Sequence, residues 1–291
     1  MFRTFRSALL ALALLAAGVA EPPLPTGQAV ALPQGNPVSQ PACALLKACG
    51  ITLQGSACSI EQSRPLSGVN YDAQRCAEPL DLLAHGIPPQ EGIGPLVYRF
   101  LGGRYRVVYD ITGEAPISEA RFNYLAQDLP LAARLATHFS KTKYVIQYRD
   151  ATLRRFHAER AQKLTGDAEM LFHDIGQRRR TYYVWGNSKF GPWKLHGSAY
   201  VDVRIRPNPK NPKTIVYDVR IRTAPENAVV NAIMRLGLFK GLVVGQIEDT
   251  MKDLVAAAKA LQGQGVEGTL KDPGFRPEDH EKIRALAALP D

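Results

Sequence analysis

This sequence lacks the short motifs that identify common hydrolases, metalloenzymes and nucleotide-binding enzymes. It contains no Gly-x-Ser-x-Gly turn, no His-Glu-x-x-His helix and no glycine-rich loop between a strand and a helix. Its six histidines lie far apart in the chain. His157, His173 and His196 fall on neighbouring expected strands, where they either converge on a site or belong to an ordinary sheet surface. We expect no catalytic residue, metal site or cofactor from these patterns.

Long apolar runs are absent except at the N-terminus. Residues 1–20 combine Arg3 and Arg6, an apolar run over 7–17 and small residues just before Glu21. This pattern is typical of a secretory signal peptide that is cleaved after residue 20. The run is shorter than the about 20 residues that span a bilayer, and no cysteine follows it directly, as one would in a lipoprotein. We expect a periplasmic or secreted protein.

Cysteine is confined to one short stretch. The four cysteines, Cys43, Cys49, Cys58 and Cys76, are separated by five, eight and seventeen residues, without the close pairs of a zinc site. An even, clustered set in an exported protein predicts two disulfides. Residues 42–48 are expected to be helical, which places Cys43 and Cys49 about 9 Å apart along the axis, beyond disulfide reach. We therefore predict nested pairing, Cys49 with Cys58 and Cys43 with Cys76.

Composition divides the rest of the chain. Residues 21–41 are rich in proline and nearly uncharged, as in a flexible leader. Residues 42–95 form a short cysteine-containing module that needs cross-links for stability. The main domain is expected at 104–262. A tail over 263–291 carries a short helix near 278–289.

Alternating apolar and polar residues predict seven strands in the main domain. The first, 105–111, is followed by two short helices within 116–140, the first capped by Ser118. The other six strands are joined only by short turns, which excludes crossover helices and predicts an antiparallel meander. They cover residues 144–149, 153–163, 168–175, 180–185, 194–206 and 214–223.

Charge predicts the register of the last hairpin. The apolar sets of its two strands must share a face, because a slip of one residue would turn one set to water. One register that satisfies this condition places Asp202 opposite Asp218. The other places Asp202 opposite Arg220 and Arg204 opposite Asp218, which pairs opposite charges. We predict the second register, with both arginines on the outer face of the sheet.

A long amphipathic helix is predicted to start at Pro225 and to continue to residue 261. Proline suits the first turn of a helix, and Glu226 complements the helix dipole. Gly237, Gly241 and Gly245 lie four residues apart on it, which indicates either close packing on the sheet or a bend that admits a ligand. A helix that closes a meander packs most simply across the apolar face of the sheet.

The order of strand, helical insert, meander and long helix resembles the helix-grip fold of the START-like superfamily, which includes lipid-transfer domains and polyketide cyclases. The resemblance covers 105–261 and is clearest over 214–252, where a strand, a proline and an amphipathic helix follow one another. It implies an α+β fold: a seven-stranded antiparallel curved sheet wrapped on a long C-terminal helix, beside a small disulfide-linked N-terminal module. In that family the cavity between sheet and helix holds lipids, sterols or other apolar molecules.

The resemblance implies binding or transfer of a lipid or other apolar small molecule. The alternatives are a cyclase- or dehydratase-type enzyme using an Arg, His or Tyr in the same cavity, and a cell-envelope interaction protein with a filled core. The expected lining residues are Tyr217, Ile233, Leu242, Val243 and Ile247, with Trp185 or Trp193 near the mouth. The two tryptophans bracket 186–192, where they either anchor a long hairpin turn or touch ligand or membrane.

The net charge is +9, of which Arg3 and Arg6 would leave with the signal peptide. The rest is dispersed over strand positions such as Arg204, Arg206, Arg220 and Arg222, on the side opposite the apolar face. Export and the lack of interleaved aromatics on this face argue against a nucleic-acid partner. The surface is either a plain solvated face or one that meets anionic lipid headgroups transiently.

Overall fold

The computed structural model describes residues 40–49, 53–54, 59–60, 73–102, 107–161, 164–190, 193–225, 240–261 and 265–290. Two compact units divide between Tyr105 and Arg106. The smaller unit holds the described residues up to 102, and the larger unit holds those from 107 onward. The predicted signal peptide and nearly all of the predicted leader lie outside the described residues.

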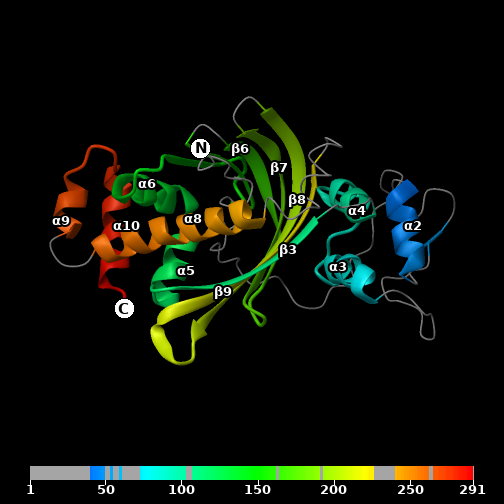
Figure 1. The fold of residues 1–291 in the computed structure, drawn as a ribbon, viewed down its shortest axis with the longest axis horizontal. Coiled ribbons are helices and arrows are strands. Elements are labelled where there is room, and N and C mark those ends of the chain that lie inside the picture. The colour runs from blue at the N-terminus through cyan, green and yellow to red at the C-terminus, as the bar shows by residue number, and fades with distance from the viewer. Residues whose placement is uncertain are drawn as a thin grey trace. The chain divides into compact units, whose positions relative to one another are not determined.

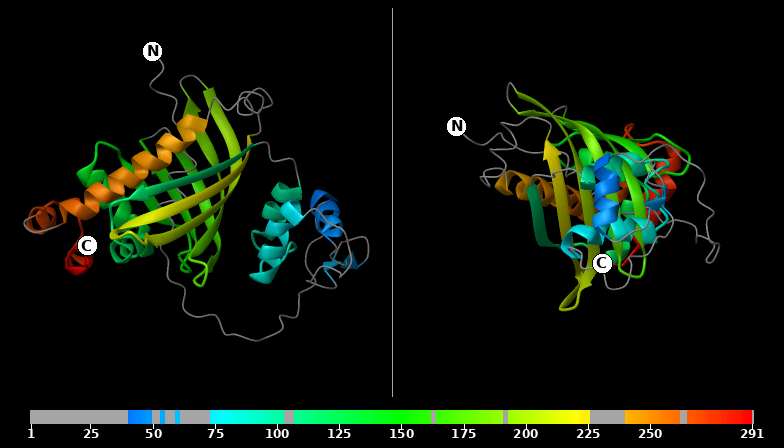
Figure 2. Two further views of the ribbon diagram at one scale, coloured as in Figure 1. Left: turned by 60° about the horizontal axis from the view of Figure 1, so that its bottom comes forward. Right: turned by 90° about the vertical axis from the view of Figure 1, so that its right-hand side faces the viewer.

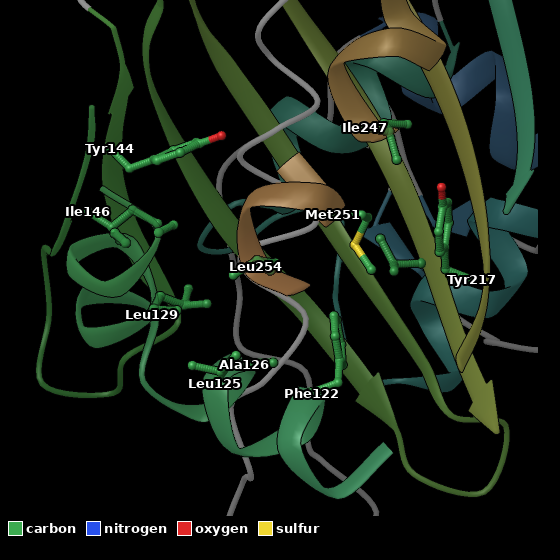
Figure 3. Close-up of a cluster of buried hydrophobic side chains, with 14 of the residues drawn as sticks. Phe122, Leu125, Ala126, Leu129, Tyr144, Ile146, Tyr217, Ile247, Met251 and Leu254 are labelled. Carbon is green, nitrogen blue, oxygen red and sulfur yellow. The ribbon is translucent and has the colours of Figure 1, made fainter. Parts of the chain in front are cut away.

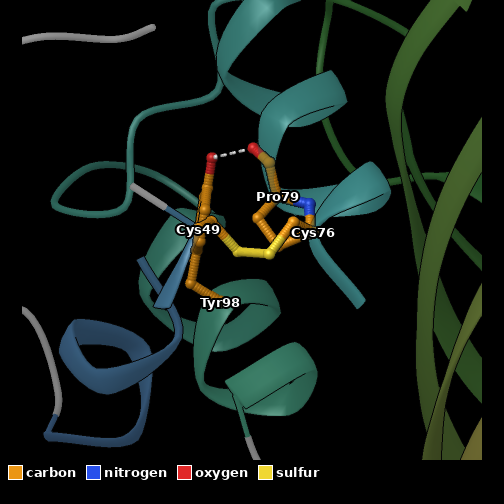
Figure 4. The surroundings of a disulfide bond; sticks show 4 residues. All are labelled: Cys49, Cys76, Pro79 and Tyr98. Carbon is orange, nitrogen blue, oxygen red and sulfur yellow. Dashed lines mark hydrogen bonds between the residues drawn. A yellow bond between two sulfur atoms is a disulfide. The ribbon is translucent and has the colours of Figure 1, made fainter. Parts of the chain in front are cut away.

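The smaller unit consists of short helices and a two-stranded ribbon, tied by a disulfide. Its elements are α2 (Gln40–Ala48), β1 (Leu53–Gln54), β2 (Ser59–Ile60), α3 (Ala73–Ala84) and α4 (Gly94–Gly102). Cys49 and Cys76 are joined, with 5.4 Å between their Cα atoms (Figure 4). The buried Tyr98 hydroxyl on α4 donates to the carbonyl oxygens of Pro79 at 3.3 Å and Ile87 at 3.0 Å. These bonds and the disulfide hold the helices of this unit together.

This disulfide corrects both predicted pairings, Cys49 with Cys58 and Cys43 with Cys76, because it joins Cys49 to Cys76. Helix α2 ends at Ala48, so Cys49 lies in the turn that follows it, and Cys76 lies in the first turn of α3. The start of α3 therefore lies beside Cys49, although 27 residues of sequence separate Cys49 from Cys76. The prediction that Cys43 and Cys49 do not pair is confirmed, and Cys43 is disulfide-bonded as well.

Seven antiparallel strands form one curved sheet in the larger unit (Figure 1). They are β3 (Val107–Ala115), β4 (Tyr144–Tyr148), β5 (Arg155–Arg160), β6 (Leu164–Asp174), β7 (Arg179–Phe190), β8 (Trp193–Asn208) and β9 (Asn211–Pro225). Strands β4 to β9 follow one another as a meander, and β3 pairs with β9 in the order β3-β9-β8-β7-β6-β5-β4. The predicted α+β class and seven-stranded antiparallel sheet are confirmed.

Helices precede β4 and follow β9. Helix α5 (Glu119–Gln127) begins after Ser118, whose hydroxyl accepts from the backbone N–H of Arg121, and α6 (Leu129–Phe139) follows it. Helices α8 (Lys240–Ala260), α9 (Gly265–Leu270) and α10 (Pro277–Ala288) follow β9. Among the described residues, no helix is both long and apolar enough to cross a membrane.

Pro225 does not start the long helix. It ends β9, where it pairs with Gly197 of β8, because the last hairpin continues further than the alternation of its side chains indicates. The part of the predicted helix that the structure describes is α8. On α8, a Cβ added at Gly241 or Gly245 would meet no atom within 4 Å, so neither glycine is required for close packing on the sheet.

The sheet and the C-terminal helices share one apolar core. Figure 2 shows α8 lying along the inner side of the curved strands. In Figure 3, Tyr144 and Tyr217 point toward α8 from opposite sides, with Ile247 and Met251 of α8 between them. The face of the sheet that carries these side chains is called the inner face below. It is the face toward which the strands curve.

The C-terminal tail belongs to this core. Phe275, Ile283 and Leu286 are buried in the same cluster. Arg121 of α5, only 5% exposed, donates from Nη1 to the Ala258 carbonyl at 3.0 Å and from Nε to the Leu289 carbonyl at 3.1 Å. This arginine ties the end of α8 and the end of α10 to α5.

The predicted register of the last hairpin is confirmed, since Asp202 pairs with Arg220 and Arg204 pairs with Asp218. The side chains choose other partners, however. Asp202 accepts from Arg179 at 2.8 Å and from Arg222 at 3.4 Å, whereas Arg220 forms an ion pair with Asp110 on β3. Neighbouring strands offered closer donors than the directly opposite residue did.

The outer face is only partly the solvated surface that was expected. Arg204, Arg206 and Arg220 are exposed there, but Arg179 and Arg222 are buried, with exposures of 8% and 5%. The two buried arginines share the carboxylate of Asp202.

Candidate functional site

Small side chains occupy one end of the inner face, across four neighbouring strands. Gly166 pairs with Gly186, and Gly186 pairs with Gly197, so three glycines lie side by side on β6, β7 and β8. Alanines or a valine flank this row on the same face. We call this set the small-residue floor: Ala158, Gly166, Ala168, Val184, Gly186, Gly197 and Ala199. Elsewhere the inner face carries larger residues such as Tyr182 and Ile221.

Two glycines of the floor, Gly166 and Gly186, are required by the backbone. A Cβ on Gly186 would lie 2.5 Å from the Cα of Gly166 and 2.5 Å from the carbonyl oxygen of Thr165. Contacts this short with backbone atoms force the strands apart, so β6 and β7 approach each other as only glycine permits. Gly166 and Gly186 were predicted in turns, and this is wrong: β6 begins at Leu164 and β7 extends to Phe190.

A buried arginine adjoins the floor. Arg160 leaves β5 on the inner face, two residues after Ala158, and pairs with Tyr144 of β4. It is 8% exposed, donates through Nη1 to the side-chain oxygen of Gln246 on α8, and lies 5.5 Å from the centre of the Tyr144 ring. Its buried Nε has no hydrogen-bond partner. Within the described part of the chain, no carboxylate lies within ion-pair distance of Arg160.

Tyr144, whose ring lies against Arg160, is hydrogen-bonded to an acidic residue of α8. The Tyr144 hydroxyl donates to Asp253 Oδ2 of α8 at 2.6 Å. Burial raises the pKa of Tyr144 most. The positive charge of Arg160 lowers it by less, and the hydrogen bond to Asp253 raises it further. Tyr144 therefore keeps its proton at neutral pH and remains a donor to Asp253. Arg160 is left as a buried cation whose described neighbours are an amide and an aromatic ring.

Two further polar groups are buried on the inner face. The Tyr109 hydroxyl has no hydrogen-bond partner, and burial raises its pKa to about 12. Arg180, at the other end of this face, is 7% exposed, and its Nε is buried without a partner. Burial also lowers the pKa of Arg180. Arg180 is flanked by Tyr182 on its own strand and by Val203 opposite, whereas Arg160 follows Ala158 of the floor on β5.

The predicted ligand-contacting residues fall into three groups. Tyr217, Val243 and Ile247 are buried together in the core between sheet and α8. Ile233, and the side chains of Leu242 and Trp193, lie outside the described residues. Trp185 is on the outer face of β7 and so does not join the core cluster. Arg160 and Gln246 were missed, although the alternation of Phe156, Ala158 and Arg160 marked the arginine as inward-facing.

A groove of about 280 Å³ lies on the outer face of the glycine row, where Gly166, Gly186 and Gly197 line it together with Trp185. His157 and His196 both line it, with Asp167 between them in the strand order, but His173 does not. His157 Nδ1 is 3.2 Å from Asp167 Oδ1. Among the described residues, no group of three potential ligands is arranged to hold a metal ion.

A second hollow, of about 300 Å³, lies at the far end of α8. Ser118, Thr214 and Ala258 are among the residues that line it. Neither hollow is lined by Tyr217, Val243 or Ile247. In comparisons with known proteins, the chain matches no protein-family model and no curated sequence.

Proposed function

We propose that the larger unit binds a lipid or other apolar small molecule between the inner face of the sheet and α8, in the helix-grip manner of START-like proteins. The observation that carries the proposal is the small-residue floor. It withdraws side-chain volume from the inner face of four adjacent strands. Apolar side chains surround it, as in sites for apolar ligands.

We further propose that the protein is exported. The signal-like residues 1–20 and the Cys49–Cys76 disulfide support this assignment, because disulfides persist mainly in oxidising compartments. An exported carrier would keep an apolar molecule out of water between two membranes or outside the cell. Dispersed surface cations such as Arg204 and Arg206 would favour brief contact with anionic headgroups during loading or release.

Native mass spectrometry tests the proposal on the full chain purified from its own organism. A bound apolar molecule that is released on denaturation is the expected result. Recovery of empty protein that also fails to bind the neutral apolar dye Nile red would overturn the proposal and favour a core filled by its own side chains.

A pair of variants places the site. Val243 is buried on α8, so Val243→Trp should weaken Nile red binding while the fold persists, because a ligand space accepts added volume that a packed core resists. Lys252→Trp puts the same side chain on the exposed side of α8 and should leave binding unchanged. Unfolding of Val243→Trp, or equal binding by both variants, would contradict a ligand space beside Val243.

A further inference from the structure

We infer that the ligand carries an acidic headgroup, a carboxylate or similar anion, which binds Arg160 while its apolar chain lies over the small-residue floor. The inference rests on the proposed function and goes beyond it by naming the class of ligand. It assigns Arg160 as the residue that selects acidic amphiphiles over neutral ones.

The first argument is the cost of an unpaired buried charge. A guanidinium removed from water is strongly disfavoured unless charge and hydrogen bonds compensate it. Arg160 is 8% exposed, yet its described neighbours are the Gln246 amide and the Tyr144 ring, and its Nε has no partner. An anionic oxygen at Nε would supply both the missing acceptor and the missing charge. Arginine presents its donors in a planar fork that suits a carboxylate.

The second argument is the placement of Arg160 relative to the floor. Arg160 lies on β5, at one edge of the floor, and the floor continues across β6 and β7 to β8. Three strand spacings of about 4.8 Å give the floor a width of about 14 Å. A headgroup at Arg160 therefore leaves a path across the strands for an extended acyl chain. A fatty acid has the matching shape, with an acidic group at one end and an apolar chain that can lie along the floor.

The third argument distinguishes Arg160 from the other cations of the sheet. Arg179 and Arg222 already share the carboxylate of Asp202 on the outer face. Arg180 is buried on the inner face beside Tyr182 and Val203, which are not part of the floor. Of these four arginines, Arg160 alone combines a buried Nε without a partner with a position beside the floor.

Competition against bound Nile red tests the inference, with palmitate and its neutral methyl ester as competitors. The wild-type full-length protein should bind palmitate about tenfold or more tightly than methyl palmitate, as one charge-assisted hydrogen bond would give. Arg160→Leu should remove this preference and leave methyl palmitate binding nearly unchanged. Arg155→Leu is the matched control: it removes an exposed arginine from the outer face of the same strand, and should keep the preference.

Each outcome separates the two proposals. Equal binding of acid and ester by the wild-type protein would overturn the headgroup inference and leave the proposed function standing. If neither compound displaces Nile red, the headgroup inference is overturned, and if the protein also fails to bind Nile red, the proposed function is overturned with it. Loss of the preference in Arg180→Leu but not in Arg160→Leu would move the headgroup to Arg180 and refute the assignment made here.

A measurement on the wild-type protein avoids dependence on folding of the variants. Palmitate labelled with ¹³C at its carboxyl carbon reports ionisation by its chemical shift. Beside Arg160, the bound carboxylate should stay ionised to a lower pH than it does in a neutral micelle, because a nearby cation favours the charged form. An unchanged or raised titration midpoint would contradict contact with the guanidinium.

Discussion

Gly186→Ala should destabilise the larger unit, because the added methyl group has nowhere to go. Its Cβ would lie 2.5 Å from Gly166 Cα and 2.5 Å from the Thr165 carbonyl oxygen, whereas ordinary contact begins at 3.4 Å. Both neighbours are backbone atoms of β6, so the strands must separate by up to about 0.9 Å. Overpacking of this kind costs about 1–3 kcal/mol. For a domain of this size the melting temperature should fall by about 2–12 °C.

The matched control is the same substitution at Gly245 on α8. A Cβ there meets no atom within 4 Å, and alanine favours a helix over glycine by about 1 kcal/mol. Gly245→Ala should therefore raise the melting temperature by about 2–4 °C. Differential scanning calorimetry of both full-length variants measures the difference. A Gly186→Ala protein as stable as the wild type would refute the close approach of β6 and β7.

Three further outcomes are expected. Cys76→Ser opens a loop that spans 27 residues and should destabilise the smaller unit alone by about 3.5 kcal/mol, as measured by chemical denaturation. A peptide map of the non-reduced wild-type protein should show Cys49 joined to Cys76. Asp202→Asn should lower the free energy of unfolding by about 3–5 kcal/mol, because two buried guanidinium groups lose their shared carboxylate. Arg220→Ala breaks an exposed ion pair and should lower it by at most about 1 kcal/mol. Equal losses of stability in the two variants would contradict this ranking. Stability should fall between about pH 10 and pH 12, because folded Tyr109 keeps its proton to about pH 12 and the unfolded chain loses it near pH 10. Tyr109→Phe should make this fall shallower without loss of stability at pH 7.

Local pattern predicted much of the fold because the larger unit is built from contacts between neighbouring elements. Each strand of the meander pairs with the next, so turns and alternation determine both topology and face. Charge then selected the register of the last hairpin, since Asp202 and Arg220 distinguish two otherwise equal alignments. The caps of α5 and the helical tail from Pro277 were also predictable from short sequence signals.

The errors share a physical cause, which is dependence on chain segments that are distant in the sequence. Glycine marks a turn in most sequences, but Gly166 and Gly186 are glycine because two strands approach closely. Cys49 pairs with Cys76 because the first turn of α3 lies beside the end of α2. Propensity at one position does not report which distant backbone will come near it.

Buried arginines on the two faces of the sheet differ in whether a carboxylate balances their charge. On the outer face, Asp202 accepts from Arg179 and Arg222, so buried charge is balanced within the fold. A sheet evolved for stability alone would treat an inward arginine in the same way or replace it by an apolar residue, which is often neutral or stabilising. Arg160 instead retains a buried Nε without a hydrogen-bond partner, and it lies beside the small-residue floor. The hydrogen bond to Gln246 and the contact with the Tyr144 ring hold Arg160 in place without balancing its charge, and an acidic ligand would supply that balance.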